Sequence, residues 1–230
     1  ADAVQSRIER EVQFASDVSH ELRSPITALA AAVEVLDARR ADLSDRTQQA
    51  LDVVVSQIRR FDQMVLDLLE LSRLDVGISD LHREEIDVVP FIRRIASRYG
   101  VDDIRIKVRE GSDSVFKIDK RRFERIMANL LENARLHGGG VTRIVIENRP
   151  NEKSRVAVED SGPGVAQSER VQIFERFARG SAGRSRAGGT GLGLALAAKI
   201  VGDHGGIIEC ESQPRQTIFR VLMPMVTGDG

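Results

Sequence analysis

Apolar residues in the first third of the chain recur at the spacing of two amphipathic helices. Over Ile8–Leu36 they return every three or four residues, which places them on one stripe of a long helix. After a polar break at residues 37–42, a second series over Leu51–Leu68 alternates steps of three and four, as a heptad seam does. Ser44 precedes this series and is the expected N-cap of its helix. The pattern predicts a helical hairpin over residues 1–76.

A single hairpin of this kind leaves part of its apolar surface uncovered. Two hairpins related by a two-fold axis bury both stripes in a four-helix bundle. The pattern therefore predicts that the chain forms a homodimer through this region.

The pattern of apolar and polar positions changes after Gly77, where short strand-like runs alternate with helical stretches. One helix is expected over Lys120–His137, because its apolar positions fall on one face, and Asp119 is its expected N-cap. Alternating strands and helices are typical of an α/β domain. We expect a linker over residues 77–86 and this second domain over residues 87–230, so that the whole chain is of the α+β class. The strand-like runs are Asp103–Val108, Arg143–Glu147, Arg155–Glu159 and Ile207–Glu211.

Composition narrows the functional classes. The 230 residues hold 34 Lys and Arg against 35 Asp and Glu, a net charge of -1, so no global charge favours nucleic acid as a partner. No apolar run approaches the roughly 20 residues that cross a bilayer. A single cysteine, Cys210, is consistent with a reducing compartment. We expect a cytoplasmic protein portion that does not bind nucleic acid.

His20 is the first residue with candidate chemistry. On a helix it lies about 200° from Val18 and Leu22 of the apolar stripe, so its imidazole should face solvent. A neutral imidazole has a lone pair that can attack phosphorus. Glu21 follows directly and could accept the other ring proton, although its side chain would have to bend around the helix to do so. Taken alone, an exposed histidine is more often an ordinary surface residue.

The stretch over residues 14–25, FASDVSHELRSP, resembles the H box of sensor histidine kinases. The resemblance implies that His20 carries a phosphoryl group, that Glu21 acts as a general base, and that the family's dimeric four-helix bundle forms here. Ser24 stands where bifunctional members typically have Thr or Asn. Its hydroxyl is compatible with a phosphatase activity.

The second domain contains candidate nucleotide-binding residues. Asp160 follows a buried strand and precedes a glycine turn with Gly162 and Gly164, where a carboxylate can accept a hydrogen bond from the exocyclic amine of adenine. Asn129 and Asn133 share one helix face, and their amide oxygens suit Mg²⁺. For the asparagines alone, ordinary surface polarity is the simpler interpretation.

A second glycine segment over residues 188–194 runs into an apolar helix at 195–201. Free backbone N–H groups at a helix start favour phosphates, although a flexible linker would have a similar composition. Between the two glycine segments lie Phe174 and Phe177, with Arg176 beside them, and the simpler interpretation is a mobile, solvated loop held in place by the two aromatic residues.

Four of these motifs, in this order, resemble the Bergerat ATP-binding fold of histidine kinases, gyrase, chaperones and mismatch-repair proteins. The resemblance covers residues 87–224 and implies an α/β sandwich, with the usual ending at His204-Gly205-Gly206 and Thr217-Ile218-Phe219. It assigns Mg²⁺ to Asn133 with Asn129 nearby, adenine to Asp160, a lid to residues 165–190, and a phosphate contact to Arg176. The residues expected to bind ATP are Asn129, Asn133, Arg135, His137, Asp160, Gly162, Gly164, Phe174, Arg176, Phe177, Gly189, Thr190, Gly191, Leu192, Gly193 and Thr217.

Two positions depart from the family pattern. Leu136 stands where a basic residue often lies near the phosphates, and the basic Arg135 is one position earlier, about 100° around the helix. Gln216 replaces a glycine that commonly precedes the threonine of the last strand motif.

The resemblance implies a kinase core that autophosphorylates His20 from ATP-Mg and passes the phosphoryl group to an aspartate of a response regulator receiver domain. It also implies the cytoplasmic portion of a plasma-membrane sensor, with any membrane region upstream of Ala1. The alternatives are an ATPase or ATP-gated clamp, a catalytically weak ATP-binding dimeric scaffold, and a phosphatase-dominant regulator.

Overall fold

The structure is a computed structural model that describes residues 24–75, 81–148, 153–178 and 189–224. The chain divides into two compact units, Ala1–Ser79 and Asp80–Gly230. Among the described residues, no helix has the length and apolar character needed to cross a membrane.

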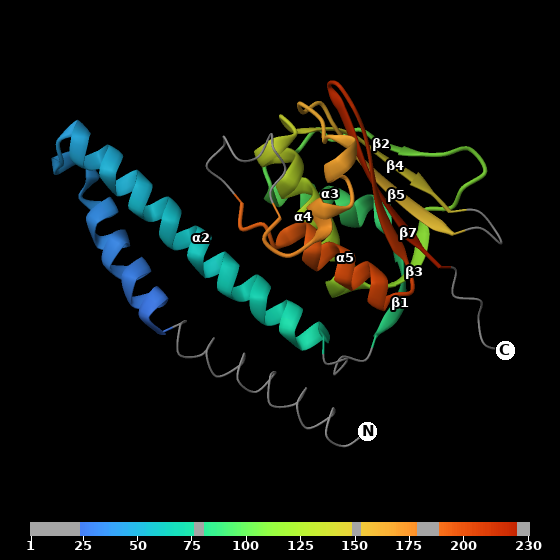
Figure 1. Cartoon of the computed structure of the whole chain (residues 1–230), viewed down its shortest axis with the longest axis horizontal. Helices are drawn as coiled ribbons and strands as arrows, with labels where there is room; N and C mark the ends of the chain where they lie inside the picture. Colours follow the sequence, from blue (N-terminus) through green and yellow to red (C-terminus); the bar gives the residue numbers. More distant parts are fainter. Residues whose placement is uncertain (1–23, 76–80, 149–152, 179–188, 225–230) are drawn as a thin grey trace, which may run out of the picture. The chain divides into compact units, whose positions relative to one another are not determined.

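The first unit contains a helical hairpin (Figure 1). Residues 24–38 are helical, a short 3-10 turn η1 follows at Arg40–Asp42, and α2 spans Asp45–Asp75. The Ser44 hydroxyl accepts a hydrogen bond from the Thr47 N–H at 3.4 Å, and the Ser44 carbonyl accepts one from the Gln48 N–H at 2.9 Å. Ser44 is therefore the N-cap of α2, as predicted.

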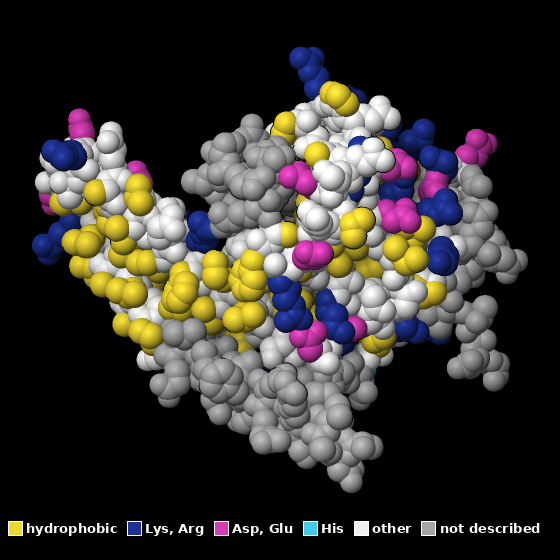
Figure 2. All heavy atoms as spheres, in the orientation of Figure 1, with side chains coloured by type: hydrophobic (Ala, Val, Ile, Leu, Met, Phe, Trp, Pro, Cys, Tyr) yellow, Lys and Arg dark blue, Asp and Glu magenta, His cyan; other side chains and the backbone are white. Residues whose placement is uncertain are grey.

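The heptad seam of α2 is divided between buried and exposed positions. Leu51 and Val65 are buried. The alternate positions Val54, Phe61 and Leu68, each seven residues apart, are exposed by 46%, 44% and 41%. Figure 2 shows apolar side chains gathered along this helix. The hairpin thus carries a row of uncovered apolar side chains.

The second unit is an α/β sandwich (Figure 1). Its main sheet has five strands in the order β2-β4-β5-β7-β6, of which β2 and β4 are parallel and the other neighbours antiparallel. A two-stranded antiparallel sheet is formed by β1 and β3. The strands are β1 (Arg83–Asp87), β2 (Ile106–Val108), β3 (Val115–Asp119), β4 (Val141–Glu147), β5 (Ser154–Asp160), β6 (Ile207–Gln213) and β7 (Gln216–Met223). The helices are α3 (Val88–Arg98), α4 (Lys120–His137) and α5 (Gly193–Asp203), with the 3-10 turns η2 (Gln167–Glu169) and η3 (Gln172–Phe174).

The central strands alternate between a core face and an outer face, since successive side chains of a strand point to opposite sides. Buried apolar side chains of β4, β5 and β7 face the helices. On the outer face, Arg143 of β4 lies opposite Glu159 of β5 and forms an ion pair at 2.7 Å. The sheet therefore has one apolar face, on which the helices pack.

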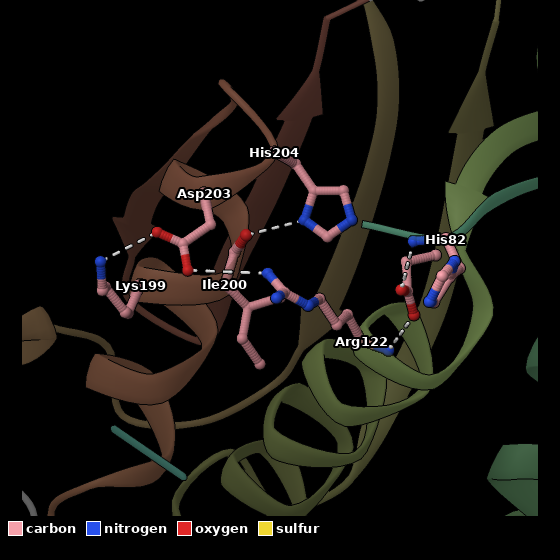
Figure 3. A network of polar contacts seen from close by, with 7 residues as sticks. His82, Arg122, Lys199, Ile200, Asp203 and His204 are labelled. Atoms are coloured by element: carbon pink, nitrogen blue, oxygen red, sulfur yellow. Dashed lines mark hydrogen bonds and ion pairs between the residues drawn. The ribbon is translucent and has the colours of Figure 1, made fainter. Parts of the chain in front are cut away.

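Helices α4 and α5 are joined by ionic and polar contacts at one end (Figure 3). Asp203 on α5 accepts from Lys199 at 2.9 Å and lies 3.6 Å from the Arg122 guanidinium of α4. His204 is buried, and its Nδ1 lies 2.8 Å from the carbonyl of Ile200. These contacts hold the start of α4 against the end of α5.

The first strand of the second unit, except its last residue Asp87, lies within the segment that we expected to be a linker. Arg83–Asp87 pair with Val115–Asp119, and the division between the units falls between Ser79 and Asp80. The carboxylate of Asp119 joins this strand to α4, because it accepts from the His82 N–H and the Arg122 N–H, each at 3.1 Å. Asp119 is therefore the N-cap of α4, and the predicted bounds of that helix are those observed.

Candidate nucleotide site

A buried carboxylate lies at the end of β5. Asp160 is the last residue of the strand, and only 3% of its surface is exposed. Burial raises the pKa of this carboxyl, while hydrogen bonds from the Gly162 N–H, at 2.9 Å, and from Thr217 act in the opposite direction. The fold thus keeps an acceptor group in a place where it has little access to water.

Two glycines allow the chain to close around Asp160. A Cβ on Gly138, at the end of α4, would lie 2.4 Å from the Asp160 Cγ. A Cβ on Gly162 would lie 2.7 Å from the Gly138 Cα. The Ser161 N–H also donates to the Gly138 carbonyl at 3.1 Å. The end of α4 and the first glycine turn are therefore in direct contact.

Asn129 and Asn133 lie one turn apart on α4, as predicted. Asn129 faces the start of α5, since a Cβ on Gly193 would lie 3.1 Å from its Oδ1. The Asn129 Nδ2 is buried and has no hydrogen-bond partner among the described residues. A buried amide without a partner is uncommon in folded proteins, and a bound polar ligand is one way to satisfy it.

The second glycine segment also reaches α4. Gly189 has a φ of +81°, and a Cβ there would lie 3.5 Å from the His137 Nε2 and 3.8 Å from the Leu136 Cδ1. The Thr190 hydroxyl accepts from the Leu192 N–H at 3.2 Å, just before α5 begins. Among the residues that the structure describes, no side-chain hydrogen bond caps α5 itself. Its first-turn N–H groups are the kind that bind anions.

The segment around Phe174 and Phe177 contacts the second glycine segment. The Phe177 N–H donates to the Gly191 carbonyl at 2.8 Å. Phe174 packs edge-on against Phe219, with ring centroids 6.3 Å apart. Phe177 is 57% exposed and has a φ of +61°, so it contacts the second glycine segment through its backbone N–H and not through a buried ring. Arg176, between them, is exposed.

The basic residue that was expected to replace the missing charge at position 136 is engaged elsewhere. Arg135 makes two hydrogen bonds to Glu132, at 2.9 and 2.6 Å, on the surface of α4. The side chains that lie beside Gly189 are His137 and the apolar Leu136. Phosphate charge in this region would therefore have to be balanced by other groups.

Thr217 lies beside Asp160 in the sheet, since the two residues are register partners on β7 and β5. Gly164 approaches the neighbouring strand, and a Cβ there would lie 3.0 Å from the Ser212 Oγ. Ser212 was not singled out from the sequence, although it lies next to Thr217 in the β6–β7 hairpin. A cross-strand partner of this kind is visible only when the register is known.

The structure brings together Asp160, both glycine segments, Phe174, Thr217 and the second half of α4. His20 and Glu21 lie outside the described residues. Ser24 is described, and it is exposed at the beginning of the helical residues 24–38.

Two family models match most of the chain. Residues 10–77 match the His Kinase A (phospho-acceptor) domain, and residues 118–227 match the Histidine kinase-, DNA gyrase B-, and HSP90-like ATPase family. The fold expected for each half is therefore confirmed.

The chain is 34% identical to the signal transduction histidine-protein kinase AfsQ2 of Streptomyces coelicolor, over 92% of this chain and 41% of that protein. It thus spans about two fifths of that relative's length. Two solved structures share the fold at lower identity. Full-length ShkA in complex with AMPPNP matches with a TM-score of 0.72 and 23% identity, over 95% of this chain and 47% of that one. Histidine kinase ThkA in complex with the response regulator protein TrrA matches with a TM-score of 0.63 and 22% identity, over 96% and 64%.

Proposed function

Because this chain belongs to the sensor histidine kinase family, we propose that it is a kinase core that transfers the γ-phosphoryl group of ATP to His20. The observation that carries this proposal is the environment of Asp160. The carboxylate of Asp160 already accepts hydrogen bonds from the Gly162 N–H and from Thr217, and it can still accept one more. The exocyclic amine of adenine is a donor of the kind that it can accept.

The residues around Asp160 fit the rest of an adenine nucleotide. The Nδ2 of Asn129 is a buried donor with no partner among the described residues. The start of α5, which no described side chain caps, supplies backbone N–H groups for phosphate oxygens. Because Leu136 is apolar and Arg135 is paired with Glu132, charge balance falls to the first turn of α5, to Arg176 and to a metal ion.

Mg²⁺ is the metal that this donor set would hold. The amide oxygens of Asn133 and Asn129 are hard neutral ligands, which suit an ion that keeps several of its waters. When bound, Mg²⁺ would neutralise charge on the transferring phosphoryl group.

The transfer itself uses His20 and Glu21. A nitrogen lone pair of His20 attacks the γ-phosphorus in line, a nitrogen–phosphorus bond forms, and the bond to the β–γ bridging oxygen breaks to release ADP. Glu21 accepts the proton from the other ring nitrogen, which removes positive charge from the phosphorylated imidazole. Onward transfer to an aspartate of a receiver domain is part of the proposal. The complex of ThkA with a response regulator supports that step by analogy.

We propose that the active form is a homodimer. The exposed row Val54, Phe61 and Leu68 supports this, because an apolar strip at heptad spacing is expected to pack against another helix.

The test is incubation of the intact chain with γ-labelled ATP and Mg²⁺, beside His20→Gln. Acid-labile, alkali-stable label on the protein is expected, and the His20→Gln variant should carry none. Steady phosphate release that does not depend on His20 would instead indicate an ATPase. Nucleotide binding without label would indicate a scaffold.

A further inference from the structure

Three buried polar residues form a row across the main sheet. Thr217 of β7 is the register partner of Asp160 on one side and of Ser212 on the other. Asp160, Thr217 and Ser212 are exposed by only 3%, 4% and 8%. Buried polar groups are nearly always hydrogen-bonded, so these three side chains are expected to find their hydrogen-bond partners within the protein.

The donors and acceptors in this row can be assigned one by one. A backbone N–H can only donate, so Val165 donates to the Ser212 hydroxyl oxygen, at 2.8 Å. An ionised carboxylate can only accept, so the hydrogen bond between Thr217 and Asp160 uses the single hydroxyl proton of Thr217. The 3.3 Å contact between the hydroxyls of Ser212 and Thr217 is then donated by Ser212.

The result is a chain of hydrogen bonds with one direction. It runs from the Val165 N–H through the hydroxyls of Ser212 and Thr217 to the carboxylate of Asp160. Each bond in such a chain polarises the next one, and each hydroxyl proton is fixed by its neighbour. If the Ser212 hydroxyl were removed, Thr217 would lose the donor that fixes its orientation, and the Val165 N–H would lose its acceptor.

Ser212 also contacts the residues at and just after the first glycine turn. Gly164 approaches its hydroxyl so closely that an added Cβ would lie 3.0 Å away. The Arg170 guanidinium donates to the carbonyls of Ser212, at 2.5 Å, and Val165, at 3.4 Å. The same serine therefore contacts both the Thr217–Asp160 pair and the first part of the loop that leads to Phe174.

We infer that Ser212 is a positioning residue that sets base specificity: it fixes Thr217 as a donor to Asp160, so that Asp160 stays an acceptor for the amine of adenine. The inference rests on the proposed function, in which Asp160 contacts the base. Guanine presents a carbonyl oxygen where adenine presents its amine, and a carboxylate acceptor rejects that oxygen. Ser212 would act through Asp160 without touching the nucleotide.

The experiment is titration calorimetry of the intact chain with ATP-Mg and with GTP-Mg, for the wild type, Ser212→Ala and Ser212→Thr. Ser154→Ala is the matched control. The Ser154 hydroxyl is also buried in β5 and hydrogen-bonded, to Asn148 at 2.8 Å, but it lies at the opposite end of the strand. Thermal melts of every variant accompany the titrations. If Ser212→Ala fails to fold, Ser212→Cys, which keeps the shape with a weaker donor, takes its place.

We expect Ser212→Ala to bind ATP-Mg about tenfold more weakly, the loss that one well-placed hydrogen bond produces, with a smaller change for GTP-Mg. Its ATP affinity should also be lost at a higher pH on acidification, because Asp160 would be less well held in its ionised form. In the labelling assay, KM for ATP should rise while kcat stays within about twofold. Ser212→Thr should restore the preference for ATP, and Ser154→Ala should match the wild type.

Other outcomes would overturn the inference in distinguishable ways. Equal loss of ATP and GTP affinity with an unmoved pH profile would mean that Ser212 has only a structural role. An unchanged ATP affinity in Ser212→Ala would exclude any role for its hydroxyl in base recognition. If the wild type binds no ATP-Mg, the proposed function itself fails, and this inference fails with it.

Discussion

The buried, ionisable carboxyl of Asp160 is unfavourable for stability but useful for binding. It is an ionisable group in a buried position, and burial raises its pKa. A raised carboxyl pKa means that the protonated form suits the fold better. The stability that this form contributes is fully present below the pKa of the unfolded chain, and it is lost as the pH rises through the folded-state pKa. At neutral pH the ionised carboxylate therefore does not contribute this stability, and the role that we propose for it is recognition of the base.

We predict that Asp160→Asn loses ATP affinity by about tenfold or more, because the ionised acceptor for the adenine amine is gone. Its free energy of unfolding at neutral pH should be no lower than that of the wild type, since the desolvated charge is removed. Calorimetric titration and urea unfolding measure the two effects. Glu209→Gln, an exposed carboxylate on β6, is the control. Retained ATP binding in Asp160→Asn would remove Asp160 from the base site.

The pKa of His204 is shifted in the opposite direction to that of Asp160. Burial lowers its pKa, with the charge of Arg122 acting in the same direction. Its Nδ1 lies against the Ile200 carbonyl, so Nδ1 carries the proton, and its buried Nε2 has no partner among the described residues. A second proton on this ring would place a charge inside the fold.

A lowered histidine pKa contributes stability above the unfolded pKa, near 6.5, that is lost as the pH falls toward the folded-state pKa. We predict that the second unit becomes less stable as the pH falls from neutral through about 6.5 and below. His204→Gln should show a smaller dependence over that range, although its stability at neutral pH will be lower. Urea unfolding at several pH values measures this, with the exposed His82→Gln as the control. Equal pH slopes for His204→Gln and the wild type would rule out His204 as the source.

Among the secondary-structure elements, those set by local pattern could be read from the sequence and those set by distant pairing could not. The α4 helix has a cap, an apolar face and a glycine after its end, and its predicted bounds are the observed ones. The β1 strand is mostly polar and exposed, and it exists because it pairs with β3 some thirty residues away. Residues 83–86 were therefore predicted to be a linker. Ser212 was missed for the same reason, because its partner Thr217 is across a hairpin whose register the sequence does not display.

The start of α4 shows how one side chain joins several elements. Asp119 caps the helix through Arg122 N–H and also accepts the N–H of His82 ahead of β1. The Arg122 side chain in turn approaches Asp203 of α5 (Figure 3). A change at Asp119 thus acts on the β1 segment and α4 together.

We predict that Asp119→Ala destabilises the second unit by more than the roughly 1 kcal/mol typical of a lost N-cap, because two backbone donors lose their acceptor. Thermal and urea unfolding of the intact chain measure the change. Asp103→Ala, an exposed aspartate in the same unit, should leave stability within about 0.5 kcal/mol of the wild type. A loss at Asp119 no larger than that of the control would mean that solvent replaces both hydrogen bonds.

At the scale of the whole molecule, the divided seam of α2 bears on assembly. Leu51 and Val65 are buried, whereas Val54, Phe61 and Leu68 form an exposed row at seven-residue spacing. An isolated hairpin would keep these three side chains in water. A second copy of the chain can cover them, because in a two-fold dimer the same exposed row of each partner packs against the other.

We predict that the intact chain is a dimer of about twice 25.4 kDa and that Phe61→Asp shifts it toward monomer, because a carboxylate in a packed apolar seam would be desolvated without a partner. Light scattering coupled to size-exclusion chromatography measures the mass over a range of concentrations. Ser56→Asp is the matched control, because it adds the same charge to α2 about 140° around the helix from Phe61. If dimerisation is required for access of the nucleotide to His20, the labelling rate of Phe61→Asp should fall with its dimer fraction while ATP affinity is unchanged. A monomeric wild type, or dissociation by Ser56→Asp alone, would show that the exposed row is not the dimer contact.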